Sequence, residues 1–424
     1  MTLALVTILH ALTHAYGAAL VPLYLLIVAD FKLSGVWAAS LIVTIYGLVY
    51  NLGSYFAGIL ADHFDRKMLL GIGLIGNALA IAAMGLTRQY DMLIVLAIFA
   101  GVFGTLFHPS ANALVPAHYP KSPGMAIGLL GIGSGVGFFF GPQFAGWRAE
   151  SAHWHFANVS AWQRPCVELG AIGLLVAVVF LIFARETSRD EQSDEAMLPN
   201  RMAVESIVTE IRGKHTAHLR PSLRNKVIAI AAVLGCRDFA GVASISLMSI
   251  YLQKAHDYTT AQAGLVVGGM MLLSVIVNPL TVYLSAGKRR LPTLVAVLIC
   301  GGLFLSIVPL VSVAWAVVMM CLFEACQMGS YSVSDAAMLE RVSAKERGRV
   351  NGLFLTLAGT FGSLAPWLIG FATDLLKSRA REPAAYLPIF AALGGMMMIA
   401  SLSTPIIGRM AEPAPRRRLT QPVG

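Results

Sequence analysis

Charged side chains are scarce in this 424-residue sequence. Asp, Glu, Lys and Arg make up 12% of it and hydrophobic residues 57%, whereas a soluble domain has about 25% charged residues. Residues 68–86 and 291–323 carry no charged side chain at all, and about 20 apolar residues in a helix cross the hydrocarbon core of a bilayer. The scarcity of charge excludes a soluble enzyme and a disordered chain, and it predicts a polytopic membrane protein.

Cysteine and the common catalytic motifs are also scarce or missing. None of the five cysteines forms a CxxC pair, which argues against a disulfide framework and a structural zinc site. The sequence has no HExxH motif, no nucleophile-elbow serine and no phosphate-binding loop. We therefore expect neither an enzyme nor an ATP-driven pump, and we expect no cofactor and no resident metal.

The apolar segments predict an all-α membrane protein with twelve transmembrane helices in two pseudo-symmetric six-helix bundles. Helices and closed barrels are the structures that satisfy the backbone in lipid, and these runs are longer than barrel strands. The expected spans are 3–27, 36–61, 68–87, 91–117, 123–147, 166–184, 227–252, 261–285, 291–313, 315–339, 349–376 and 385–408.

One long polar interval divides the spans six and six. We expect an N-terminal bundle at 1–184, a cytoplasmic linker at 185–226, a C-terminal bundle at 227–410 and a cytoplasmic basic tail at 411–424. With the N-terminus in the cytoplasm, most of the 31 Lys and Arg residues fall in cytoplasmic segments, as the positive-inside rule requires. Both termini are therefore predicted to be cytoplasmic, in a multi-pass protein of the cell (inner) membrane.

The two halves share a pattern of small residues and proline. Four positions of the fifth span recur 224 residues later, in the eleventh span. The pairs are Gly128 and Gly352, Gly135 and Gly359, Pro142 and Pro366, and Gly146 and Gly370. Such a duplication is typical of transporters built from paired repeats.

The segment after the second span, GILADHFDRK at 58–67, resembles the loop 2–3 signature of the major facilitator superfamily, G-x-x-x-D-R/K-x-G-R-R/K. The matching residues are Gly58, Asp62, Arg66 and Lys67. The resemblance covers nearly the whole chain and implies that these residues serve a cytoplasmic gate. It also implies that Asp62 docks on the positive N-terminal end of the eleventh span, near residues 348–352.

Two positions depart from this signature. His63 replaces the usual basic residue, and Asp65 replaces a glycine that serves a tight turn. Asp is one of the few residues that adopt left-handed backbone angles at low cost. We therefore expect the turn to be retained.

The fifth span carries a second family pattern. Residues 128–146 read G-x8-G-x3-G-P-x2-A-G, which is similar to the antiporter-associated motif of the same family. Small residues allow close helix contact, and proline bends the helix. The resemblance implies a gating role for five residues and a link to export. They are Gly128, Gly137, Gly141, Pro142 and Gly146.

Residues 106–110, LFHPS, together with a histidine in the first span, are similar to the fosmidomycin-resistance branch of efflux carriers. Drug–proton antiporters of the family often carry an arginine in the fourth span, four residues before a glycine. Here that position is Ala97, before Gly101. A proton route copied from those carriers is therefore not indicated.

Polar side chains near the bilayer centre are the candidate site, because a charge there costs roughly 2.5–3.5 kcal/mol on insertion scales. The candidate substrate-binding residues are His10, His14, Tyr46, Tyr50, Asn51, His108, Asn112, Arg237 and Gln327. The candidate proton-coupling residues are Asp238, Glu324 and Asp335. The ionisable ones lie in spans one, four, seven and ten, which line the central cavity in the facilitator family.

Some of these residues have a second interpretation. Arg237 with Glu324 or Asp238 can form a structural ion pair. In the tenth span, Glu324, Gln327, Tyr331 and Asp335 share one helix face, which predicts a polar stripe facing the transport pathway.

These features favour a secondary active transporter that exports a small organic, anionic or drug-like solute by alternating access, coupled to protons. The expected partners are the small-molecule substrate, the proton and the lipid bilayer, with no nucleic acid and a monomeric state. One alternative is a divalent metal exporter that uses His10, His14 and His108. Another is a membrane sensor that transports nothing.

Overall fold

The computed structural model describes residues 1–119, 121–151, 159–185, 219–343 and 346–410. Within these residues the chain is helical, without strands, and twelve helical segments are long and apolar enough to cross a membrane. The predicted all-α class and the twelve spans are confirmed. Most of the predicted linker, at 186–218, and the predicted tail at 411–424 lie outside the described residues.

The first six spans are built from eight α-helices and one 3₁₀ turn. In chain order they are α1 (Thr2–Ala19), η1 (Val21–Leu23), α2 (Tyr24–Phe31), α3 (Val36–His63), α4 (Arg66–Met84), α5 (Tyr90–Gly104), α6 (Phe107–His118), α7 (Pro123–Glu150) and α8 (Gln163–Phe183).

The last six spans follow the same plan. They comprise α10 (Pro221–Ala255), α11 (Thr260–Leu272), α12 (Ser274–Leu284), η3 (Gly287–Arg289), α13 (Arg290–Ile307), η4 (Val308–Leu310), α14 (Val313–Leu339), α15 (Arg347–Ser363), α16 (Ala365–Asp374), η5 (Lys377–Arg381), η6 (Pro383–Tyr386), α17 (Leu387–Ile399), η7 (Ala400–Leu402) and α18 (Ser403–Gly408).

Several expected spans are broken helices. The first breaks at Pro22, the fourth ahead of Pro109, the eighth ahead of Pro279 and the eleventh ahead of Pro366. Proline has no N–H to donate and its ring crowds the carbonyl four residues earlier, so the helix bends or restarts near it.

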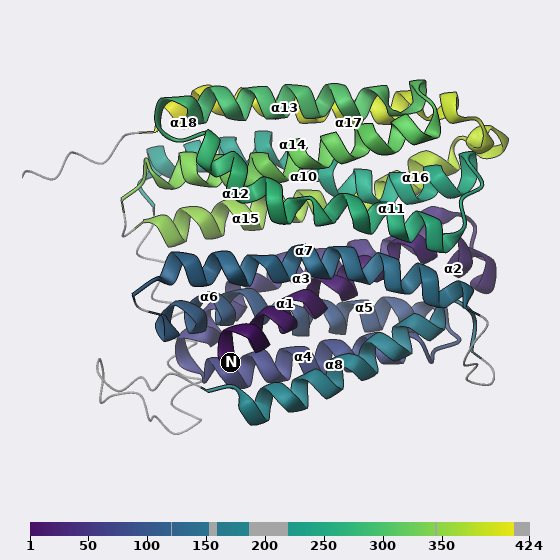
Figure 1. The fold of residues 1–424 in the computed structure, drawn as a ribbon, viewed down its shortest axis with the longest axis horizontal. Helices are drawn as coiled ribbons and strands as arrows, with labels where there is room; N and C mark the ends of the chain where they lie inside the picture. Colours follow the sequence, from purple (N-terminus) through teal and green to yellow (C-terminus); the bar gives the residue numbers. More distant parts are fainter. Residues whose placement is uncertain (120, 152–158, 186–218, 344–345, 411–424) are drawn as a thin grey trace, which may run out of the picture.

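The two halves of the chain lie side by side (Figure 1), with α1–α8 below and α10–α18 above. The N-terminus and α18 lie at the same end of the molecule. Contacts between the halves run mainly along α7 against α11, and along α3 against α15 and α16.

These contacts are dense at the end of the bundle opposite the termini, which we name the closed end. There a Cβ on Gly146 would lie 2.5 Å from the Thr260 carbonyl oxygen, and a Cβ on Gly370 would meet Ser40. Glycine is needed at such positions because only hydrogen leaves room for a neighbouring backbone to approach.

The halves separate at the end that carries the termini, which we name the open end. A Cβ on Gly58, Gly128 or Gly352 would have no neighbour within 4 Å. A crevice of about 910 Å³ lies here between α7 and α12, bordered by Gly128 and Tyr283. Gly128 and Gly352 are equivalent positions of the internal repeat, and both lie at the open end. Gly146 and Gly370 are also equivalent, and both lie at the closed end.

Candidate functional site

A cavity of about 230 Å³ lies between the two halves, with walls from α1, α3, α7, α10, α14, α15 and α16. Five predicted site residues line it, together with Tyr331 of the predicted polar stripe. The five are His14, Tyr46, Tyr50, Asn51 and Asp238. The expectation that spans one, four, seven and ten form the walls is therefore wrong in part, because spans two, five and eleven contribute and span four does not.

The other predicted site residues lie away from this wall. His10 and His108 stand behind His14, at ring-centroid distances of 4.8 Å and 5.6 Å from it. Asn112 is exposed on α6, and Gln327 is buried. The fourth span bends between α5 and α6, ahead of Pro109, so a helical register drawn through that span did not predict where its side chains lie.

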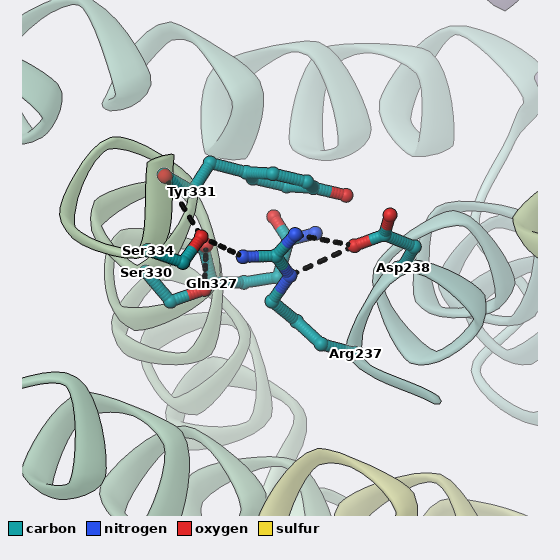
Figure 2. A network of polar contacts seen from close by, with 6 residues as sticks. All are labelled: Arg237, Asp238, Gln327, Ser330, Tyr331 and Ser334. Carbon is teal, nitrogen blue, oxygen red and sulfur yellow. Dashed lines mark hydrogen bonds and ion pairs between the residues drawn. The ribbon is translucent and has the colours of Figure 1, made fainter. Parts of the chain in front are cut away.

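Arg237 is fully buried and its guanidinium is held on three sides (Figure 2). Its Nε donates to Asp238 Oδ1 at 2.8 Å, its other side donates to Ser334 Oγ at 2.8 Å, and its carbon lies 3.8 Å from the centre of the Tyr331 ring. Of the two predicted ion pairs, the structure forms the one with Asp238. Because Asp238 and Tyr331 line the cavity, they stand between Arg237 and any solute there.

The carboxyl group of Glu324 is buried, and neither of its oxygens has a hydrogen-bond partner within the described residues. A charge in such a place has no counter-charge to offset its desolvation. Further along α14, Oδ1 of Asp335 is also without a hydrogen-bond partner in the described part of the chain.

The polar stripe of the tenth span faces mainly α10. Gln327 packs where a Cβ on Gly241 of α10 would stand, and Ser334 binds Arg237 of the same helix. Tyr331 is the member of the predicted stripe that borders the cavity. The expectation that the stripe as a whole faces the pathway is therefore wrong for Glu324 and Gln327, which are buried.

Three histidines form a compact cluster next to the cavity. His10 and His14 are one turn apart on α1, and His108 comes from α6. The candidate ligand nitrogens of the three rings lie within 4.8 Å of one another. His10 Nδ1 donates to the Leu130 carbonyl at 2.8 Å, because a carbonyl can only accept, and Nε2 of His10 is 3.0 Å from Nε2 of His14.

The glycines of the fifth span lie against other helices. A Cβ on Gly137 or Gly141 would collide with the α1 backbone, at Ala11 and Ala15 respectively, while Gly128 has open space. Pro142 contributes its carbonyl oxygen to the contact with Gly264 of α11. The motif thus packs α7 against α1 within one half and against α11 in the other half.

The loop 2–3 segment has a different local structure from the one expected. Asp65 has φ −58° and ψ 121°, and its Oδ1 accepts a hydrogen bond of 2.6 Å from the Met68 N–H. The left-handed turn is therefore wrong, and aspartate serves here as the N-cap of α4, a position that it favours. Asp62 is exposed at the open end, and its docking on the eleventh span stays a prediction.

Some residues of the cavity wall were not predicted. Ser363 of α15 accepts a hydrogen bond of 2.9 Å from Asn51 Nδ2 across the two halves, and Phe138 of α7 packs 4.4 Å from the His14 ring centre. Serine and phenylalanine are common in apolar spans, so neither carries a sequence signal. Their role depends on which helices face each other.

Twelve helical spans in two facing halves, with a cavity between them, define a membrane transporter and not an enzyme. The chain belongs to the Major Facilitator Superfamily, whose sequence model matches residues 3–366. This confirms the family resemblance found in the sequence.

Three comparisons illustrate the relationship. The chain is 23% identical over 371 residues to Protein ZINC INDUCED FACILITATOR-LIKE 1 of Arabidopsis thaliana, covering 81% of this chain and 77% of that protein. It is 28% identical over 170 residues to Multidrug resistance protein MdtG of Dickeya zeae, covering 40% of this chain and 39% of that protein. A bacterial homolog of the human lysosomal transporter Spinster, in an inward-facing and occupied conformation, has a similar fold, with a TM-score of 0.73, 17% identity and coverage of 96% of both chains.

Proposed function

We propose that this transporter exports a small organic solute from the cytoplasm by alternating access, coupled to the entry of protons. The observation that carries the proposal is the central cavity, which lies between halves that are packed at the closed end and apart at the open end. Rocking of residues 1–184 against residues 227–410 would expose this cavity to the two sides in turn. We propose that one chain is sufficient for this motion.

The orientation follows from the charge distribution. Lys and Arg are concentrated in the segments on the side of the termini, so that side is cytoplasmic by the positive-inside rule. The open end then faces the cytoplasm, in a multi-pass protein of the cell (inner) membrane. The antiporter-like motif of α7 and the multidrug resistance relatives support export as the direction.

The proton is assigned to the carboxyl groups of the C-terminal half. Asp238 borders the cavity and is paired with Arg237, so a proton and a solute that donates a hydrogen bond compete for its carboxylate. Glu324 and Asp335 are the other carriers in this scheme, since each has a carboxyl oxygen without a partner among the described residues. Because Asp238 holds either the solute or the proton, the two are bound in alternate states, as their exchange across the membrane requires.

Transport into everted vesicles under an imposed pH gradient tests this function. Candidate anionic and drug-like solutes that stabilise the purified protein in a thermal-shift screen serve as substrates. We expect accumulation that collapses with the gradient, and uncoupled or abolished transport in Asp238→Asn and Glu324→Gln. Coupling that is unchanged in both variants would eliminate this assignment of the proton, and the transporter function would stand.

A second candidate function is export of a divalent metal ion, and the histidine cluster is the observation that favours it. Uptake of the metal into everted vesicles by the wild type, lost in His10→Ala and His14→Ala, is the expected result. Equal uptake by these variants and the wild type would remove this candidate.

A further inference from the structure

The cluster of His10, His14 and His108 has no part in the proton scheme above. Three ring nitrogens from two helices converge within 4.8 Å of one another, beside the central cavity. We propose that this histidine cluster binds a divalent transition metal ion of the zinc type. The inference goes beyond the proposed function, because such a site binds its ion whatever solute the cavity carries.

The hydrogen bonding of His10 prepares it as a ligand. Its Nδ1 donates to the Leu130 carbonyl of α7 at 2.8 Å, which leaves Nε2 of the neutral ring with a free lone pair. Histidines that bind metals usually donate their other ring N–H to a carbonyl or carboxylate in this way, which fixes tautomer and orientation. Leu130 therefore acts as the outer-shell partner of the proposed site.

The short contact between two histidines marks the position of the ion. Nε2 of His10 and Nε2 of His14 are 3.0 Å apart, so one proton lies between them when the site holds no metal. A metal ion replaces that proton, and His14 moves its hydrogen to Nδ1. In a tetrahedral zinc site with Zn–N distances of 2.0–2.1 Å, the nitrogens are about 3.4 Å apart, so small rotations of the rings suffice.

Aromatic contacts hold the rings in place. Phe107 stacks on His10 with centroids 4.8 Å apart, and Phe138 packs 4.4 Å from the His14 ring centre. Tyr50 approaches the edge of His108 at 6.0 Å. Because neighbours limit their motion, the three ligands lose little conformational freedom when they bind an ion.

The ligand set selects the type of ion. Within the described residues the cluster contains imidazoles alone, without a carboxylate or a thiol. Imidazole suits zinc, cobalt, nickel and copper ions, whereas magnesium and calcium require oxygen ligands. His14 borders the cavity, so water or an anionic group of a solute could reach the cluster from that side and serve as a further ligand.

Direct metal binding by the full-length protein in detergent tests the site. The protein is purified through a tag without histidine, stripped with a chelator and titrated with Zn²⁺ against a chromophoric competitor. Co²⁺ is used in parallel for its absorption spectrum. We expect one ion per chain, a spectrum typical of tetrahedral Co²⁺, and no binding of Mg²⁺.

Variants separate the cluster from other histidines. We expect His14→Ala to weaken Zn²⁺ binding by at least about 100-fold, because losing a direct ligand costs more than the roughly 10- to 100-fold lost with an outer-shell partner. His118→Ala is the matched control, since His118 is on α6 like His108 but bonds to the Leu114 carbonyl of its own helix. It should bind like the wild type.

The outcomes are decisive because binding is read without transport. Size-exclusion profiles and thermal midpoints of the metal-free variants identify any variant that fails to fold. If His14→Ala fails to fold, His14→Gln is used in its place. Wild-type binding that is no tighter than that of a folded His14 variant overturns the proposal. Zinc binding in a protein that exports an organic solute leaves the proposed function intact, and transport of that solute without zinc binding refutes only the metal site.

Discussion

The carboxylate of Asp374, at the end of α16, accepts a hydrogen bond of 3.0 Å from the backbone N–H of Trp37 at the start of α3. Its counterpart is Glu150 at the end of α7, which accepts one of 2.8 Å from the N–H of Ala261 at the start of α11. The two acidic residues are separated by 224 positions, the spacing of the internal repeat. In each case an acid from one half caps a helix of the other half, where the helix dipole favours a negative charge.

These two caps are expected to hold the closed end together. A cap of this kind is worth about 0.5–2 kcal/mol, so Asp374→Ala or Glu150→Ala should shift the equilibrium toward opening of this end by roughly 2- to 30-fold. Spin labels on Gln89 and Arg381, one in each half, report the change as a longer distance population. Glu382→Ala is the control, because Glu382 pairs only locally with Arg379 within the described residues. Equal distance distributions in the wild type and all variants would show that the two caps do not hold the closed end together.

The repeated glycines at the open end predict a conformation-specific defect. Gly128 and Gly352 have open space in this structure, yet their closed-end counterparts Gly146 and Gly370 are in tight contact. If the open end closes by the same kind of packing, Gly128→Val with Gly352→Val should leave the thermal midpoint unchanged and reduce the transport rate at least about tenfold. Wild-type transport by this double variant would show that the open end closes without those glycines.

The contact of α7 with α1 predicts a stability defect. A Cβ on Gly137 would collide with the carbonyl oxygen of Ala11, and backbone cannot yield as a flexible side chain can. We expect Gly137→Val to lower the unfolding free energy by about 1–3 kcal/mol, the usual cost of overpacking. Thermal unfolding in detergent measures it, with Gly131→Val as the control because Gly131 has no close neighbour. Equal losses from the two substitutions would contradict the argument.

Removing one partner of the buried Arg237–Asp238 pair should destabilise the protein. Asp238→Leu leaves an uncompensated buried guanidinium, which costs about 3–5 kcal/mol. The double variant Arg237→Met with Asp238→Leu removes both charges, so its thermal midpoint should return toward that of the wild type while transport stays lost. A double variant that is less stable than the single one would mean that the pair itself stabilises the fold.

Substitution of Glu324 should have the opposite effect on thermal stability from substitution of Asp238. Its carboxyl oxygens have no hydrogen-bond partner among the described residues, so Glu324→Gln removes a charge and breaks no bond. We expect a thermal midpoint equal to or above that of the wild type, together with loss of proton coupling. A clear drop in the midpoint would show that this carboxyl group has a structural partner.

Much of the architecture could be predicted from the sequence because insertion in lipid imposes simple conditions. Charge-free runs of the required length predicted twelve spans, and proline marks where four of them break. The repeat that pairs Gly146 with Gly370 was visible as spacing alone. The structural role of these glycines could not be predicted. A glycine in the sequence indicates that a neighbouring group comes close, but it does not indicate which backbone that is.

The site was predictable as a set of residue types and not as an arrangement. Polar residues at mid-span identified Arg237, Asp238 and the three histidines, because each costs free energy in a bilayer unless something binds it. Which of them meet depends on helix rotation and on bends such as the one ahead of Pro109, where fixed periodicity fails. The sequence left open whether Arg237 pairs with Asp238 or Glu324, and whether His108 meets His10 and His14. Only the tertiary structure decided these contacts and placed Glu324 away from the cavity. Whether side chains on separate helices meet depends on how those helices pack, and a local sequence pattern does not predict that packing.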